Sequence, residues 1–465
     1  MNNEHESNIR RLEERRQHDV TGPAASVTHA PDPSIPFLRP DESFGDKGRM
    51  ILSSPGHVLS VVSSICPTAN DNGSKFWVTA YDYAIPPATP SNYAAVARIT
   101  KQGQVDTSFG QNGFAQIKFD ENNTSFPLSI HETDKGELIV TGRLRVRKGA
   151  ASIFTGVIVK LLPTGLPDIT FGTQGVVYIP DALNIKGTMN ISHNFLAVDP
   201  DGKILILAYI MNTQPNGENF TTLARLTKDG QLDTSFQGNG QFRVEKDHQR
   251  AYPYALARDI GSERIIAICA SIEANGELEP YMVGFKSNGK RDSTFGESAY
   301  VDLSKYFISI SDCAVSHTNG KLLVTGIQGN SAALMVFTAE GRGELNFNEG
   351  HPVYMDFGTY DTNIWWHAHG SPTPAGSIMA FGDGSPAGDS AFYAVVGRYT
   401  SDGKPDTSFA GESSIAQPPL GETFSLTKDS FTRLSHESFL ITGRFSDSAA
   451  IFAFKDQSGD NETPI

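Results

Sequence analysis

The sequence lacks several features that would assign it directly to a class of protein. Its 465 residues include only three cysteines, at spacings that match no metal-binding motif. The longest apolar run, ILILAYIM at 204–211, is far below the roughly 20 residues needed to cross a bilayer. The net charge is −14, and lysine and arginine are scattered rather than clustered. We therefore expect no nucleic-acid partner, no membrane insertion, no metal and no cofactor.

The common enzyme signatures are also missing. The sequence contains no G-x-S-x-G elbow, no phosphate-binding loop and no Rossmann fingerprint. Its N-terminus has no hydrophobic stretch that resembles a cleavable signal peptide. The expected location is the cytoplasm, or the outside of the cell by a non-classical export route. Cys269 and Cys313 lie in apolar contexts, and we expect all three cysteines, including Cys66, to be buried, reduced thiols.

What the sequence does contain is a motif that recurs along most of its length. Residues 105–114 read VDTSFGQNGF, and related stretches read LDTSFQGNGQ, PDITFGTQGV and PDTSFAGESS. Seven copies run in tandem, each with an acidic residue three positions before an aromatic one. These fixed pairs are Asp41 and Phe44, Asp106 and Phe109, Asp168 and Phe171, Asp233 and Phe236, Asp292 and Phe295, Glu344 and Phe347, and Asp406 and Phe409.

Four apolar segments of strand-like length separate each motif from the next. In the second unit they read FAQIKFD, FPLSIHETD, ELIVTGRLRV and TGVIVKLLPTG, with turn signals between them. A unit of four consecutive strands is typical of a propeller blade, whereas a solenoid is the competing repeat architecture. We therefore predict an all-β fold: a seven-bladed β-propeller of four-stranded antiparallel blades over residues 37–460.

The stretches KQGQVDTSFGQNG and KDGQLDTSFQGNG resemble the delta-60 repeat, which occurs in tandem in bacterial proteins. The similarity extends over roughly residues 37–457, although copies five to seven depart from the pattern. It implies a bacterial propeller, but no defined reaction, ligand or catalytic residue.

The motif has a direct physical interpretation. Its carboxylate can accept hydrogen bonds from backbone N–H groups two or three residues later, while its glycines permit positive φ. The aromatic side chain can then pack between adjacent blades. The alternative of a bound cation is weaker, because one acid per motif supplies few oxygen ligands.

The two ends of the chain suggest how the ring closes. No motif follows the last strand, at 449–459, and no strand precedes the first motif, at 39–48. We expect Asp41 to Gly48 to dock after the last strand and close the ring non-covalently. Residues 1–36 are expected to form a partly helical or disordered N-terminal extension, and residues 461–465 a C-terminal tail.

Propellers place ligands over the central channel, so the innermost strands are expected to carry the site. We assign the segment just after each motif as the innermost strand, and its alternating residues as the channel wall. This wall can simply be polar, can bind a small polar ligand, or can pair Asp302 with Glu245 or Asp356 for acid/base work. The channel candidates are Gln116, Lys118, Tyr178, Arg243, Glu245, Asp302, Tyr354 and Asp356.

A second candidate site is DTNIWWHAHG at 361–370. Strand alternation predicts Trp365, His367 and His369 on one face and Trp366 on the other. Packing, stacking on a ligand through an exposed tryptophan, and metal binding through the histidines are the three alternatives, and all four residues are ligand-binding candidates.

The sequence favours a non-catalytic ligand-binding or scaffold protein that binds a glycan, peptide or protein partner through the channel mouth and rim loops. The alternative is a hydrolase or lyase with acid/base residues in the central channel. A second alternative is a structural component of a larger assembly, tethered through residues 1–36. The oligomeric state stays open.

Overall fold

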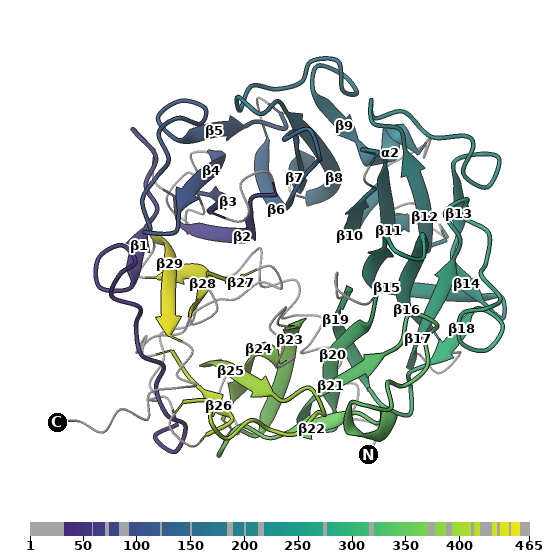
Figure 1. Ribbon diagram of the computed structural model, residues 1–465. Helices are drawn as coiled ribbons and strands as arrows, with labels where there is room; N and C mark the ends of the chain where they lie inside the picture. The colour runs from purple at the N-terminus through teal and green to yellow at the C-terminus, as the bar shows by residue number, and fades with distance from the viewer. Residues whose placement is uncertain are drawn as a thin grey trace.

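The protein is a ring of seven antiparallel sheets around a central channel (Figure 1), which confirms the predicted seven-bladed β-propeller. The computed structural model describes residues 32–57, 59–69, 74–82, 93–120, 123–148, 151–183, 189–199, 201–212, 218–272, 277–315, 320–370, 377–386, 393–410, 413–418, 430–434, 438–445 and 448–455. Two short helices, α2 (Ile179–Ala182) and η1 (Asn348–Gly350), interrupt the strands.

Each blade uses strands in chain order. Blade 1 contains β2 (Val61–Pro67), β3 (Lys75–Tyr81), β4 (Ala94–Thr100) and β5 (Phe114–Ile117). Blade 2 contains β6 (Thr124–Glu132), β7 (Leu138–Lys148), β8 (Ala151–Leu161) and β9 (Val176–Tyr178). Blade 3 contains β10 (Met189–Val198), β11 (Ile204–Asn212), β12 (Phe220–Leu226) and β13 (Gln241–Arg243). Blade 4 contains β15 (Gln249–Asp259), β16 (Arg264–Ile272), β17 (Leu278–Phe285) and β18 (Tyr300–Asp302), with β14 (Glu245–Lys246) paired to the start of β15.

The remaining three blades follow the same order except at the closure. Blade 5 contains β19 (Ser309–Val315), β20 (Leu322–Gln328), β21 (Ser331–Phe337) and β22 (Val353–Met355). Blade 6 contains β23 (Thr362–Gly370), β24 (Ile378–Ser385), β25 (Tyr393–Tyr399) and β26 (Ile415–Ala416). Blade 7 contains β27 (Phe431–Arg433), β28 (Ser438–Phe445) and β29 (Ser448–Lys455), completed by β1 (Arg49–Ile51).

The second and third strands of each blade are buried on both faces, because each sheet packs against the blades on either side. The run ILILAYI in β11 shows the effect, since every residue from Ile204 to Ile210 is buried. A strand buried on both faces reads as a continuous apolar run rather than as an alternating one. Cys269 and Cys313 are buried free thiols, as predicted, whereas Cys66 is only partly buried.

The segment after each motif is the outermost strand of a blade, not the innermost. In Figure 1, β2, β6, β10, β19 and β23 lie towards the channel, while β5, β9, β13, β22 and β26 lie at the periphery. First strands of adjacent blades also contact one another, as β19 contacts β23. Our assignment of the channel wall was therefore wrong, because an alternating polar pattern is equally typical of a peripheral strand with one solvated face.

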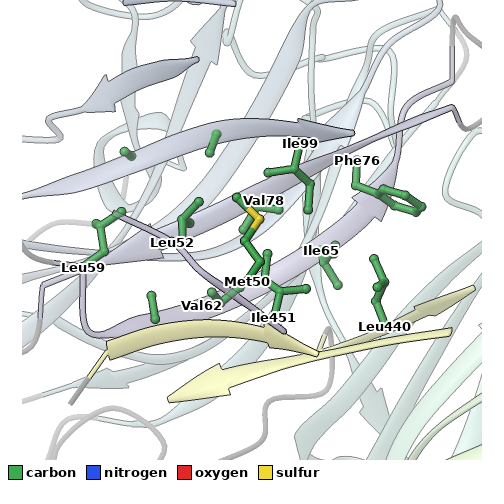
Figure 2. Close-up of a cluster of buried hydrophobic side chains, with 14 of the residues drawn as sticks. Met50, Leu52, Leu59, Val62, Ile65, Phe76, Val78, Ile99, Leu440 and Ile451 are labelled. Carbon is green, nitrogen blue, oxygen red and sulfur yellow. The ribbon is translucent and has the colours of Figure 1, made fainter. Parts of the chain in front are cut away.

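The ring closes between the two ends of the chain, as predicted. Met50 of β1 pairs with Ile451 of β29, and the Asp41 N–H donates to the Ala453 carbonyl oxygen at 2.9 Å. Figure 2 shows the apolar seam beneath this junction, where Met50 and Leu52 lie with Ile451 and with blade 1 side chains such as Val62. The first motif thus completes the seventh blade.

The repeated motif forms a joint between neighbouring blades. Each motif carboxylate accepts the backbone N–H two residues later, at 3.1–3.2 Å, and each motif Phe is at most 2% exposed. Phe295 lies against Gly341 in a turn of the next blade, and the following residue, Gly296, donates its N–H to Glu340 of that turn at 2.7 Å. The predicted turn and the predicted packing of the aromatic between blades are confirmed.

Every motif acid also has a basic partner, which the sequence interpretation missed. The Arg264 guanidinium lies 2.8 Å from Asp292, and both side chains are less than a tenth exposed. Burial alone raises the pKa of Asp292, but hydrogen bonds from Thr294 and Arg264 outweigh it and lower that pKa. The other motifs pair Asp41 with Lys455, Asp106 with Arg98 and Lys75, Asp168 with Lys160, Asp233 with Arg225, Glu344 with Lys321, and Asp406 with Arg398.

Residues 32–36, which we assigned to the N-terminal extension, contact the propeller. Residues 1–31 and the tail 461–465 are outside the described residues, but residues 32–36 pack on the propeller. Asp32 accepts hydrogen bonds from the Thr359 N–H and hydroxyl, and Ile35 is buried against blades 5 and 6. Within the described residues, no helix is both long and apolar enough to span a membrane.

Candidate acid–base site

Within the described residues, the first strands of blades 1 to 6 carry a β-bulge at an equivalent place, one extra residue that breaks the pairing register with the second strand. Bulges re-aim side chains and are common beside functional sites. The residues that directly follow the bulged position are Ser64, Ser129, His193, Ala255, Asp312 and His367 in blades 1 to 6.

Blades 5 and 6 depart from the serine found at this position in blades 1 and 2. In blade 2, Ser129 bonds to Thr141 directly opposite, at 2.8 Å between the two hydroxyl oxygens. Blades 5 and 6 instead carry Asp312 and His367, on first strands that contact each other. The repeat therefore places an acid and an imidazole at equivalent positions of neighbouring blades.

Asp312 and His367 form a short polar contact between two neighbouring inner strands. The Nδ1 atom of His367 lies 2.5 Å from Oδ2 of Asp312, and the two side chains are 18% and 5% exposed. A carboxylate that accepts from Nδ1–H fixes the tautomer whose Nε2 carries the lone pair. Among the described residues, Nε2 has no hydrogen-bond partner. The arrangement can accept and return a proton at Nε2.

The two tryptophans beside His367 have structural partners. Trp365 is fully buried, packs on Phe357 and donates its indole N–H to the Tyr399 hydroxyl at 2.9 Å. Burial raises the pKa of Tyr399, so this hydroxyl stays neutral. Trp366 is the bulged residue, and its indole N–H lies 2.5 Å from Asp383.

The bulge overturns the predicted alternation along this strand. Trp366 packs with Ile364 and Ile327, while Trp365 shares a core cluster with Ala368, because the extra residue shifts the faces. Trp365 has no surface for a ligand, so stacking there is excluded. The side chain of His369 is outside the described residues, and ligand binding by Trp366 and His367 stays a prediction.

The channel candidates lie at the outer edge of the ring instead. These residues lie on the outermost strands of five blades or directly after those strands. They therefore do not converge on the channel. Asp302 accepts from Ser304, and Asp356 accepts from Ser331 at 2.6 Å. The proposed pairing of Asp302 with Glu245 or Asp356 in the channel was wrong for this reason. The peripheral set is Gln116, Lys118, Tyr178, Arg243, Glu245, Asp302, Tyr354 and Asp356.

Two tyrosines of this peripheral set join adjacent blades. The Tyr178 hydroxyl in blade 2 donates to the Phe119 carbonyl, just after blade 1, at 2.9 Å. The Tyr354 hydroxyl in blade 5 donates to the Tyr306 carbonyl, just after blade 4, at 3.3 Å. Arg243 pairs with Glu218 and lies over the Phe220 ring, all within blade 3 and its flanking loop. These contacts give the three side chains a structural role.

The charge of the inner site is acidic. The four strands that form it, β19, β20, β23 and β24, contain Asp312 and Asp383 but no lysine or arginine. Sequence reasoning missed Asp312 because it looked for the channel on the wrong strand. The available signal was the comparison of ISDCAV with the equivalent stretches of units 1 and 2, where Ser64 and Ser129 stand in place of the acid.

Among the comparisons with known proteins, one family model supports the propeller. A family model described as "Domain of unknown function (DUF5122) beta-propeller" matches residues 200–236, and no curated protein matches the chain. An α-L-arabinofuranosidase from Fusarium graminearum is 13% identical, with 81% of this chain and 98% of that chain covered and a TM-score of 0.42. An α-L-arabinanase from Penicillium chrysogenum is 12% identical, with coverages of 74% and 99% and a TM-score of 0.43. An ulvan lyase is 10% identical, with coverages of 86% and 94% and a TM-score of 0.45.

These neighbours correct our expectation of a non-catalytic ligand-binding or scaffold protein. The three solved structures are an arabinofuranosidase, an arabinanase and an ulvan lyase rather than binding or scaffold proteins. Likeness at this level of identity extends to the fold alone. The case for a particular chemistry therefore has to come from the residues of the chain itself.

Proposed function

We propose that the protein is a hydrolase in which His367 is the acid/base residue and Asp312 its positioning partner. The observation that carries the proposal is the 2.5 Å contact between His367 Nδ1 and Asp312 Oδ2 on the first strands of blades 5 and 6. In this geometry Nε2 takes a proton from a water molecule as the water attacks, and returns it to the leaving group. Asp312 stabilises the imidazolium that forms in between.

The charges of the site support an uncharged substrate. Asp312 and Asp383 are both buried, and the four strands around them carry no lysine or arginine. An anionic substrate would be repelled by these carboxylates. Proton abstraction next to a uronate carboxylate also needs a cation that stabilises the developing charge. Hydrolysis of a neutral ester or glycoside is therefore favoured over uronate elimination.

The test is a substrate panel on the full chain. It contains nitrophenyl esters, neutral nitrophenyl glycosides, arabino-oligosaccharides, and ulvan as an anionic comparator. On any neutral substrate that is cleaved, His367→Gln and Asp312→Asn should each lower kcat/KM by about 10²–10⁴-fold. His351→Gln is the matched control, because His351 is an exposed histidine outside the inner strands. Full activity in His367→Gln would overturn the proposal, and cleavage of ulvan alone would favour a lyase.

We also propose that the tandem motif is a delta-60 repeat of bacterial type. The recurring acid, hydroxyl and aromatic support this assignment, since each has the same structural role in the regular copies. In Asp106, Ser108 and Phe109, for example, the acid accepts the serine hydroxyl at 2.7 Å and the Phe is buried. A profile built from the seven copies and scanned against bacterial sequences tests the assignment.

A further inference from the structure

Blade 1 contains a closed pair of buried hydroxyl groups beside its bulge. Ser63 is the bulged residue of β2, and Thr79 lies opposite the next residue on β3. The Ser63 and Thr79 hydroxyl oxygens are 3.0 Å apart, and the residues are 3% and 0% exposed. The two hydroxyl groups are therefore hydrogen-bonded to each other, which is what we mean by a closed pair.

Blade 5 contains the equivalent pair of hydroxyl groups, but there they are not hydrogen-bonded to each other, and we call this pair open. Ser311 is the bulged residue of β19, and Thr325 lies opposite the next residue, Asp312, on β20. Ser311 is 6% and Thr325 is 0% exposed. Neither hydroxyl oxygen has a hydrogen-bond partner among the described residues. The open pair adjoins the carboxylate that holds His367.

A buried hydroxyl group without a partner is unfavourable, and such groups in native proteins commonly mark a bound water or ligand. Leu323 and Ile327 flank Thr325 on the same face of β20, and both pack towards blade 6. Within the described residues, the surroundings of Thr325 are therefore apolar on either side. Such a site suits one oxygen atom rather than a large polar group.

We propose that Ser311 and Thr325 bind a single hydroxyl oxygen, from a water molecule or from a hydroxyl group of the substrate, next to the Asp312–His367 pair. A water in this position hydrates the Asp312 carboxylate and holds its orientation. A substrate hydroxyl in the same position anchors the substrate beside His367. The substrate version rests on the proposed hydrolase function, whereas the water version stands without it.

Crystallography of the full chain separates the two sources. Crystals grown without polyols should show one oxygen within hydrogen-bonding distance of both hydroxyls if the source is water. Density that appears only after a glycerol soak, at soak concentrations down to the millimolar range, indicates a site for an alcohol hydroxyl. Absence of density in both crystals overturns the inference.

Matched variants of the two blades complete the test. Thr325→Val should abolish the bound oxygen, Thr325→Ser should keep it, and Thr79→Val in blade 1 should leave it in place. On a cleaved substrate, Thr325→Val should raise KM about tenfold if a substrate hydroxyl binds, the loss expected for one hydrogen bond. Activity that survives in His367→Gln would remove the hydrolase proposal, but it would leave a crystallographic oxygen at Thr325 intact. A missing oxygen together with an inactive His367→Gln would overturn this inference alone.

Discussion

The backbone N–H of Asp41 lies 2.9 Å from the carbonyl oxygen of Ala453, so the first motif of the chain bonds to its last strand. The Ala453 N–H in turn donates a hydrogen bond to the Gly48 carbonyl oxygen of the same motif, at 2.8 Å. The seventh blade has no outer strand of its own and uses β1 instead. The ring is therefore held at this one junction by non-covalent contacts between segments some 400 residues apart.

A chain that begins at Arg49 should lose most of this junction. It keeps β1 but lacks the motif that orients it, including buried Phe44 and the Asp41 bonds. We expect a sharply lower melting temperature and a broader transition in calorimetry. A chain that begins at Asp32 is the control, because it retains every described contact. Equal melting temperatures for the two truncations would contradict the closure mechanism.

The motif aromatics should dominate the stability of each joint. Phe295 is fully buried against the turn of the next blade, whereas Ile169 in another motif is 75% exposed. Phe295→Ala should lower the free energy of unfolding by about 3–5 kcal/mol through cavity formation. Ile169→Ala should change it by less than about 0.5 kcal/mol. Urea denaturation measures the change in the free energy of unfolding for both variants. Similar changes would show that the joint does not depend on the buried motif aromatic.

Substitution of Arg264 should lower the free energy of unfolding more than substitution of Arg243, because Arg264 is buried and Arg243 is exposed. Arg264 pairs with Asp292 in a nearly buried setting and lies over the Phe295 ring. Removing one member of a buried pair leaves an uncompensated charge, so Arg264→Ala should cost about 3–5 kcal/mol. Arg243 is 46% exposed in its pair with Glu218, and Arg243→Ala should cost at most about 1 kcal/mol. A larger loss for Arg243→Ala would contradict its peripheral placement.

The sequence predicted the fold well because the repeat constrains it. Seven copies of an acid, a turn and an aromatic can be aligned by eye, and four strands per copy leave few architectures. The closure between Asp41 and the last strand followed from what each end lacked. The basic partners of the acids were missed, although four of them stand eight residues before their motif acid, namely Arg98, Lys160, Arg225 and Arg398. Arg264 breaks this spacing, because it lies 28 residues before Asp292.

The candidate site was only half predicted, and the reason is geometric. His367 was recognised in the WWHAH stretch, but Asp312 lies 55 residues earlier and meets it only because β19 and β23 are neighbours around the channel. The bulge at Trp366 could not be read from an alternating pattern, which assumes an unbroken register. Placing the channel on the outermost strand then directed attention to Arg243 and Asp302 instead.

The buried carboxylate of Asp32 gives a prediction for pH. Burial raises its pKa, but hydrogen bonds from Thr359 and Ser34 outweigh this and lower the pKa from 3.8 to about 2. Since the folded value is below the unfolded one, Asp32 stabilises the fold above about pH 4, and this contribution is lost as the pH falls towards 2.

Asp32→Asn should therefore be less stable than the parent at pH 7, by an amount that shrinks as the pH falls from about 4 towards 2. Urea denaturation at pH 7, 5, 4 and 3 measures the difference in the free energy of unfolding. Asp134→Asn is the control, because Asp134 is exposed in the turn between β6 and β7 and should show no such trend. A difference that stays constant across this range would mean that Asp32 acts through its shape and neutral hydrogen bonds rather than through its charge. In that case the segment before the first motif would be held by Ile35 and by the Gln417 side chain, whose amide donates to the Asp32 and Ile35 carbonyls.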